Sequence, residues 1–422
     1  MPSLAKNVAS QVRLLRSARL PFLMLWTAGA TVVACLAGGT FLGFQISGLT
    51  WFLTLLLALL VLIRQAGSVR LPLWLWLPWV ALVITYMSTS HYAHAFQRSV
   101  MLLCPLAVGA AVSSFPIPAE KVRGLSLLIR FTAVALLGMV FINTGLLVTG
   151  QLPGTSGLAS QSITACLLAC YFAAEFAHGN KRALVWWGLM AFIPIIGLTR
   201  MAILAAGCTL PFTLAPLSMK KRTLMAVGGV ALLVAVFYTP RVQHKMFYSG
   251  HGSITDLSMN NPDLATSGRR DLWAAMEYRI RANPWFGYGA NASEKFVVDQ
   301  TGGLTHPHND WLRLRYDYGW LGTSLYFLCI MAQVFHSWRK ARSARGDVKT
   351  LLLAGASSFL PFAMIMYTDN IILYAAFFGN LQFALIGMGY SASYETQRAQ
   401  AVRRAPKIIA RGPRFTDLRA AR

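Results

Sequence analysis

The sequence predicts an all-α integral membrane protein, and three observations lead to this class. Hydrophobic residues make up 56% of the 422 residues, and the mean hydropathy is +0.52. Apolar runs of about 20 residues, long enough to cross a bilayer as a helix, recur along the chain. Only 12% of the residues are charged, roughly half of the usual share, and they are crowded between the apolar runs. This pattern excludes a soluble domain.

About twelve transmembrane helices are expected from the apolar runs and the basic residues that separate them. We place them at residues 20–38, 46–63, 71–88, 97–115, 124–148, 159–177, 182–198, 200–217, 222–238, 318–337, 349–367 and 370–389. Lysines and arginines cluster before the first helix and after every second helix, which predicts that both termini are cytoplasmic. A cleaved signal peptide is the alternative for the first run, but the apolar stretch from Leu20 continues with only small breaks into a second span.

This topology divides the chain into five segments. They are a cytoplasmic N-terminus (1–19), transmembrane helices one to nine (20–238), a periplasmic loop (239–317), transmembrane helices ten to twelve (318–390) and a basic cytoplasmic tail (391–422). The net charge of +24 comes mainly from the cytoplasmic side, where it fixes orientation and where the tail would contact anionic lipid headgroups, so no nucleic-acid partner is expected. The outer loop carries nine basic and eight acidic residues, so any anion site in it must be local.

The six cysteines all fall inside predicted spans, and none lies in the outer loop, where the compartment would permit disulfides. They are Cys35, Cys104, Cys166, Cys170, Cys208 and Cys329. Cys166 and Cys170 share a helix face, but small and apolar residues surround them and no histidine is near in sequence. We therefore expect neither a disulfide-held loop nor a metal site, and no cofactor.

Arg200 is the one ionisable residue between Arg182 and Lys220, at the reversal between two short spans. Such a reversal cannot rise far above the membrane, so Arg200 is expected at or just below the outer interface, in a poorly solvated position. The alternatives are an arginine that reaches lipid phosphates and an anion ligand that faces an internal cavity, and we favour the second.

Two short helices are expected in the outer loop. The first has Thr266 or Ser267 as its cap and an apolar stripe of Leu272, Trp273, Met276 and Ile280, which would rest on the membrane domain or at the interface. Arg269 and Arg270 would lie in its first turn, where backbone N–H groups favour phosphate. A solvated face is the alternative for Arg269, Arg270, Arg279 and Arg281. We accept this alternative for Arg279 and Arg281 but not for Arg269.

The second loop helix is expected to begin near His306, with Pro307 in its first turn. A neutral imidazole at His308 suits proton abstraction from a hydroxyl, and Asn309 or Asp310 could orient it. Ordinary surface polarity, or weak metal binding by His306 and His308, is the alternative. An ion-coupled transporter is the competing class of protein, but no acidic residue or lysine lies near the middle of a span and no internal repeat is evident.

Four motifs recur in order: G-R-x-x-x-W at Gly268, Arg269 and Trp273, P-x-x-G-x-G from Pro284 to Gly289, H-x-H-N-x-x-L from His306 to Leu312, and G-x-x-G at Gly319 and Gly322. They follow a T-R-x-x-x-L segment that contains Arg200. The region from about Gly197 to Gly322 resembles the superfamily of O-antigen ligases and polymerases. The first six helices match this superfamily only in number and hydrophobicity.

The resemblance implies a GT-C-like, inverting, metal-independent glycosyltransferase of the bacterial inner membrane. Its donor would be a glycan on undecaprenyl diphosphate, and its acceptor a lipid A core sugar on the periplasmic face. Arg200 and Arg269 would bind the diphosphate, His308 would be the base, and His306 a secondary contact. A second arginine, Arg270, follows the motif arginine, although the G-R register favours Arg269 for the phosphates.

The chain length and the single dominant outer loop favour a ligase within this superfamily. A polymerase of O-antigen or exopolysaccharide shares the motifs and remains the alternative, followed by a transporter of lipid-linked glycans. The sequence makes no prediction of oligomeric state.

Overall fold

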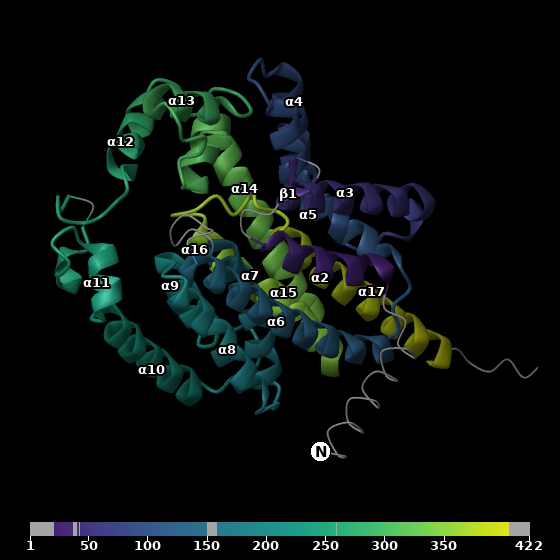
Figure 1. The fold of residues 1–422 in the computed structure, drawn as a ribbon. Helices are drawn as coiled ribbons and strands as arrows, with labels where there is room; N and C mark the ends of the chain where they lie inside the picture. Colours follow the sequence, from purple (N-terminus) through teal and green to yellow (C-terminus); the bar gives the residue numbers. More distant parts are fainter. Residues whose placement is uncertain (1–20, 37–39, 42, 150–157, 259, 405–422) are drawn as a thin grey trace, which may run out of the picture.

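The computed structural model describes residues 21–36, 40–41, 43–149, 158–258 and 260–404 (Figure 1). The predicted cytoplasmic N-terminus with Lys6, Arg13, Arg16 and Arg19, and the tail beyond Arg404, lie outside these residues. The described chain up to residue 149 forms α2 (Phe22–Ala34), β1 (Thr40–Phe41), β2 (Phe44–Gln45), α3 (Ile46–Gln65), η1 (Ala66–Ser68), η2 (Leu73–Leu75), α4 (Leu77–Thr89), α5 (Ala95–Ser114) and α6 (Ala119–Val148). The two strands pair antiparallel, with Thr40 opposite Gln45.

The remaining elements run from residue 159 to residue 404. They are α7 (Ala159–Ala177), α8 (Ala183–Ile196), α9 (Arg200–Thr209), α10 (Met219–Phe237), α11 (Pro240–Met246), η4 (Ile254–Asp256), α12 (Arg269–Ile280), α13 (Ala292–Thr301), α14 (Asp310–Ser343), α15 (Gly346–Ser357), α16 (Phe359–Ile365) and α17 (Gly379–Arg404).

The described chain is mostly helical, as an all-α membrane protein should be. Five stretches in it are long and apolar enough to cross a membrane, or six if α10 and α11, which meet at a bend of 76°, count as one broken span. Several of the other predicted spans coincide with shorter apolar helices, such as α2, α4, α8 and α9. A multi-pass membrane protein is therefore supported, and the count of twelve spans stays a prediction.

Two predicted spans differ from the observed helices for local reasons. α9 ends at Thr209 because Pro211 and Pro216 follow, and proline lacks the N–H that a continuing helix needs. The helix expected from residue 370 begins only at Gly379. One backbone N–H of the intervening segment, that of Ile372, donates to the Asp310 carboxylate at 2.7 Å instead of closing a helical turn.

The centre of the bundle is held by a close approach of α5 and α17. A Cβ atom on Gly387 would lie 2.2 Å from the carbonyl oxygen of Gly109, so a larger residue at this crossing would force the helices apart. Small residues at a helix crossing allow backbone contact, which supplies packing energy where lipid removes most of the hydrophobic driving force.

The segment from α10 to α13 curves away from the bundle and returns to it through α14 (Figure 1). Leu272, Met276 and Ile280 of the apolar stripe of α12 form a small core, separate from that of the bundle, with α13 and the first turns of α14, including Leu312 and Tyr316. The expectation that this stripe rests on the membrane domain or at the interface stays a prediction. α13 was not among the predicted elements. The segment 239–317 thus has a core of its own, which gives the side chains of this segment a fixed support.

α14 joins this outer core to the bundle through a break at Gly319, whose φ of 65° and ψ of −168° are not helical. The P-x-x-G-x-G loop fills the break: Trp320 N donates to Pro284 O at 2.8 Å, and Gly289 N donates to Asp317 O at 3.0 Å. A Cβ on Gly319 would lie 2.2 Å from Trp285 O, and one on Gly287 would lie 2.7 Å from Asp317 O. The glycines of two motifs are therefore explained by one backbone-to-backbone contact.

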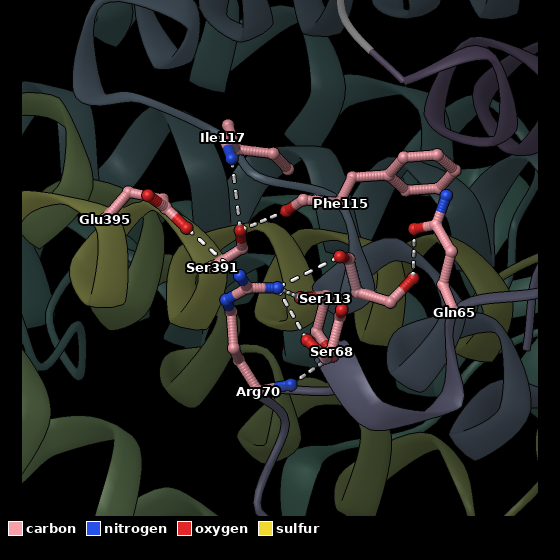
Figure 2. Close-up of polar contacts among 9 residues, drawn as sticks. Gln65, Ser68, Arg70, Ser113, Phe115, Ile117, Ser391 and Glu395 are labelled. Carbon is pink, nitrogen blue, oxygen red and sulfur yellow. Dashed lines mark hydrogen bonds and ion pairs between the residues drawn. The ribbon is translucent and has the colours of Figure 1, made fainter. Parts of the chain in front are cut away.

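A cluster of polar contacts around Arg70 joins α3, α5 and α17 at the end of the bundle remote from α12 and α13 (Figures 1 and 2). The Arg70 guanidinium donates to Ser114 O at 2.9 Å and Ser68 O at 2.5 Å, and it pairs with Glu395 at 3.0 Å. It also lies 4.8 Å from the ring centre of Tyr394. We call these residues the Arg70 clamp.

Candidate active site

A cavity of about 1280 Å³ lies between the bundle and the α10–α12 segment. Its lining brings together residues that are far apart in sequence: Arg200, Lys245, Arg269, Trp273, His308 and Asp369. Most of the remaining lining is apolar, and part of it comes from α9 and α10, including Ile203, Leu204, Val230, Leu233 and Val234. The cavity therefore joins a cationic part to an apolar part.

Arg200 is the first residue of α9 and is half-buried in the cavity wall. Its Nη2 donates to Ala265 O of the outer loop at 3.0 Å, and its Nη1 contacts the Met246 sulfur at 3.5 Å. The guanidinium therefore faces protein and cavity, and its role as an anion ligand stays a prediction. A carbonyl and a thioether leave its positive charge unneutralised, so it can still attract an anion.

Arg269 and Arg270 begin α12, but only Arg269 lines the cavity. Arg269 Nη1 donates to Thr368 O at 2.9 Å, whereas the Arg270 guanidinium donates to Asn261 O within the loop. Burial lowers the pKa of Arg269, and the carboxylate of Asp369 opposes this shift. The geometry thus favours Arg269 over Arg270 as the anion ligand. The predicted caps are wrong, because Gly268 with φ of 76° occupies the cap position and no side chain caps the helix.

His308 lies in the cavity wall, but not on a helix as expected. α14 begins later, at Asp310, with Asn309 as its cap. His308 has a φ of 50°, an uncommon conformation for a residue other than glycine. The preceding residue is fixed from α12, since Trp273 Nε1 donates to Pro307 O at 2.7 Å. The tryptophan of the G-R-x-x-x-W motif thus connects the helix of Arg269 to the loop of His308.

The contacts to the His308 ring come from the segment between α16 and α17. Its Nδ1 lies 3.6 Å from Asp369 Oδ1 and 3.3 Å from Asn370 Nδ2. The orienting contact expected from Asn309 or Asp310 is therefore supplied elsewhere. The Asn309 side chain accepts from Leu312 N at 3.0 Å to cap α14, and Asp310 Oδ2 accepts from Ile372 N. These two residues position the loop segments around His308.

His306 does not line the cavity. Its Nδ1 is buried, and no hydrogen-bond partner for it occurs among the described residues. Burial, followed by the positive charges of Arg313 and Arg98, lowers the pKa of His306 to about 3. The ring is therefore neutral near pH 7. Its predicted role as a secondary contact would have to be indirect, through the loop that carries His308.

Asp369, Asn370 and Lys245 were not among the predicted site residues. Asp369 had a signal in the sequence, because it is the sole acidic residue between Asp347 and Glu395 and sits between two apolar runs. Lys245 had none that separates it from the other basic residues of the loop. As for metals, the described residues contain no cluster of three His, Cys, Asp or Glu side chains.

Two arginines, a histidine and a carboxylate thus line one cavity, and all but the carboxylate lie in a segment that matches a known family. Residues 183–327 match the O-Antigen ligase family. The matched segment, about a third of the chain, contains Arg200, Lys245, Arg269 and His308 but not Asp369. The resemblance found in the motifs is thereby confirmed over this segment, and it supports an activity of the O-antigen ligase or polymerase type. A search of curated proteins gave no match.

Members of the O-antigen ligase family are glycosyltransferase-like enzymes of polysaccharide biosynthesis. The match and the apolar helices together support a membrane protein of lipopolysaccharide biosynthesis.

Proposed function

We propose that the chain is an O-antigen ligase of the bacterial inner membrane. It would transfer a glycan from undecaprenyl diphosphate to a lipid A core sugar on the periplasmic face, with inversion and without a metal ion or cofactor. Its partners would be these two lipid-linked substrates and the surrounding membrane lipids, and both termini would be cytoplasmic.

The cavity shared by Arg200, Arg269 and His308 is the observation that carries this proposal. A polyprenyl-linked donor has an apolar chain and a diphosphate, and the cavity has an apolar part on α9 and α10 beside two guanidinium groups. Guanidinium can bind phosphate oxygens through two parallel hydrogen bonds, which suits an anion held without a metal. His308 and Asp369 in the same wall supply a base and a carboxylate at the cationic part.

The proposed reaction uses these residues in the following way. His308 takes the proton of the acceptor hydroxyl, and the acceptor oxygen forms a bond to the anomeric carbon of the donor glycan. The bond between that carbon and the phosphate oxygen breaks, and its electron pair stays on the phosphate. Arg200 and Arg269 stabilise the charge that develops on the leaving undecaprenyl diphosphate. Direct displacement inverts the anomeric centre.

The surroundings of the His308 ring suit it to act as a base through Nε2. Asp369 stands near Nδ1 and favours the tautomer that carries its proton there. Rotation of the Asn370 amide by a half turn would bring its Oδ1, which is buried and has no hydrogen-bond partner among the described residues, toward the same Nδ1–H. Both acceptors would leave the Nε2 lone pair available for the substrate proton.

A reconstituted transfer assay tests the proposal. Purified protein, a preassembled lipid-linked polymer and lipid A core should yield capped lipopolysaccharide. Longer lipid-linked oligomers without any added acceptor would identify a polymerase instead, and movement of intact donor across vesicle membranes without transfer would identify a transporter.

The role of His308 is tested in the same assay. His308→Ala should abolish transfer while membrane insertion remains normal, because no other described histidine lines the cavity. His251→Ala is the matched control, since His251 is an exposed histidine of the same outer segment. Full activity of His308→Ala would contradict the assignment of the base.

A further inference from the structure

Four large apolar side chains are exposed where the P-x-x-G-x-G loop meets α14. Trp285 and Phe286 of the loop are 65% and 60% exposed, and Trp320 and Leu321 of α14 are exposed as well. Leu321 N donates to Trp285 O at 3.1 Å, so the loop and this part of the helix are joined through their backbones. We call Trp285, Phe286, Trp320 and Leu321 the outer patch. A group of large apolar side chains facing water is costly and indicates a surface that contacts a partner or a membrane.

The outer patch leads into an exposed apolar face of α14. After the break at Gly319, this face continues along the helix with Phe327, Leu328 and Met331, all of which are exposed. α14 is one of the described helices that are long and apolar enough to cross a membrane. The surface that begins at the outer patch is therefore the surface that α14 would present to lipid.

Tryptophan–arginine pairs mark both ends of this face. The Arg315 guanidinium lies 4.4 Å from the ring centre of Trp320, and the Arg342 guanidinium lies 5.1 Å from that of Trp338. Tryptophan is enriched at the two boundaries of a bilayer, where long cationic side chains reach the headgroups. The helix from Trp320 to Trp338 spans roughly 27 Å at about 1.5 Å per residue, close to the hydrocarbon thickness of about 30 Å. Trp320 is therefore at the level of the outer boundary.

A second apolar helix places the loop at the same level. α4 packs beside α14, and the ring centres of Tyr86 and Tyr318 lie 5.2 Å apart between them. The Tyr86 hydroxyl donates to Phe286 O at 2.7 Å, about one turn before α4 ends at Thr89. The loop thus lies at the outer ends of two apolar helices, and not above them in the water.

We propose that the P-x-x-G-x-G loop is a membrane anchor, with Trp285 and Phe286 inserted between the headgroups and the acyl chains of the outer leaflet. Bilayer lipid is the occupant because the outer patch continues into the exposed face of α14 and lies at a boundary level on two helices. The anchor goes beyond the proposed chemistry and does not depend on it. Since α12 ends at Ile280, shortly before the loop, the helix that carries Arg269 would be tied to the membrane surface at this end.

The accessibility of a spin label in the full-length protein tests the anchor. Trp285→Cys and Phe286→Cys are labelled separately with a nitroxide, in a Cys208→Ser background whose other five cysteines are buried. The protein is placed in vesicles of phosphatidylcholine and phosphatidylglycerol. Apolar oxygen concentrates in the bilayer, whereas a polar nickel chelate stays in water, so the ratio of their collision rates with the label reports depth. Both substituted side chains are exposed, so the fold should tolerate either label, and each label decides the result alone.

Two matched positions give the reference values. Leu328→Cys reports the lipid-facing side of α14, and Gln300→Cys reports an exposed polar position of α13 in the same outer segment. The ratio of oxygen to nickel collisions at positions 285 and 286 should be several times that at position 300 and lower than that at position 328.

Two results would overturn the anchor. A ratio equal to that of the Gln300→Cys label would place the loop in water. Shielding from oxygen and from the nickel chelate alike would show that protein covers the outer patch, and magnetic broadening between labels would identify that protein as a second copy of the chain.

Discussion

The arginine of the Arg70 clamp and the two cavity arginines differ in whether their positive charge is neutralised within the fold. Arg70 donates hydrogen bonds to carbonyl oxygens and pairs with Glu395 (Figure 2). It also packs against Tyr394. Arg200 and Arg269 each donate to one carbonyl oxygen, and neither forms an ion pair with a carboxylate of the described residues. All three guanidinium groups are partly buried.

The comparison shows that burial alone does not identify a functional arginine. A guanidinium whose charge is neutralised within the fold stabilises the fold, and breaking such a pair leaves an uncompensated charge. A guanidinium that faces a cavity with its charge unneutralised is costly to the fold and favours an anionic ligand. The two regions should therefore respond differently to the same substitution.

Replacing a cavity arginine should produce the largest effect. Arg200→Gln and Arg269→Gln are each expected to reduce transfer by about a hundredfold to a thousandfold, the range for loss of a group that stabilises developing negative charge. Their melting temperatures should stay close to that of the unsubstituted protein, because few internal contacts are lost. Transfer rates and thermal unfolding in detergent measure the two effects. A large loss of stability with normal transfer would show that these arginines stabilise the fold and do not bind the substrate.

Replacing Arg70 should affect stability instead. Arg70→Gln removes the partner of Glu395, and both side chains are only about 15% exposed, so we expect the folded state to lose about 2 kcal/mol. The protein that remains folded should transfer glycan at a normal rate, since the clamp lies away from the cavity. The Glu395→Gln variant and the double variant complete a cycle that isolates the pair. Strict additivity would show that the two residues do not interact.

The sequence predicted the parts of the site that are marked by local exceptions. Arg200 stood out as a lone charge between apolar runs, and Arg269 and His308 lay in ordered motifs. The stripe of Leu272, Trp273, Met276 and Ile280 was predicted from its spacing, and all of these side chains are buried except Trp273, which is half-buried. Such features depend on neighbours within a few residues, so a single sequence reveals them.

Features that depend on distant segments were not predictable in this way. Asp369 approaches His308 only because α14 and the α16–α17 connection meet in space. The partners of the α12 stripe were also not predictable, because they lie on α13, which was not expected, and on the first turns of α14. The start of α14 was misplaced because Pro307 and Asn309 are both compatible with a helix start, and the structure uses Asn309.

Replacing Trp273 tests whether the cavity, like the Arg70 clamp, depends on hydrogen bonds within the fold. Trp273→Phe keeps an aromatic ring but loses the hydrogen bond to Pro307 O, so the His308 loop should be held less firmly. We expect transfer to fall about tenfold, the scale of one hydrogen bond, with a small change in melting temperature. Trp26→Phe removes a comparable bond to Thr54 and should leave transfer unchanged. An equal loss in both variants would point to general destabilisation.

Lowering the pH should destabilise the folded protein through His306, near the cavity, and not through the Arg70 clamp. This is the smallest of the expected effects. The folded state holds the pKa of His306 at about 3, below the value of about 6.5 expected in the unfolded chain. Above that unfolded value His306 is neutral in both states and has no influence. As pH falls below it, the unfolded chain binds the proton first, so the folded state loses stability down to about pH 3.

This loss should be on the order of 1 kcal/mol at pH 5.5. The Arg70 clamp contains no histidine among its residues and should not respond in this range. The side chain introduced in the His306→Gln variant cannot take up the proton. The melting temperature of this variant should therefore fall less than that of the unsubstituted protein between about pH 7.5 and about pH 5.5, a range that brackets the unfolded pKa of histidine. If the melting temperatures of the two proteins fell equally across that range, His306 would be protonated as readily in the folded state as in the unfolded chain, and the prediction would be wrong.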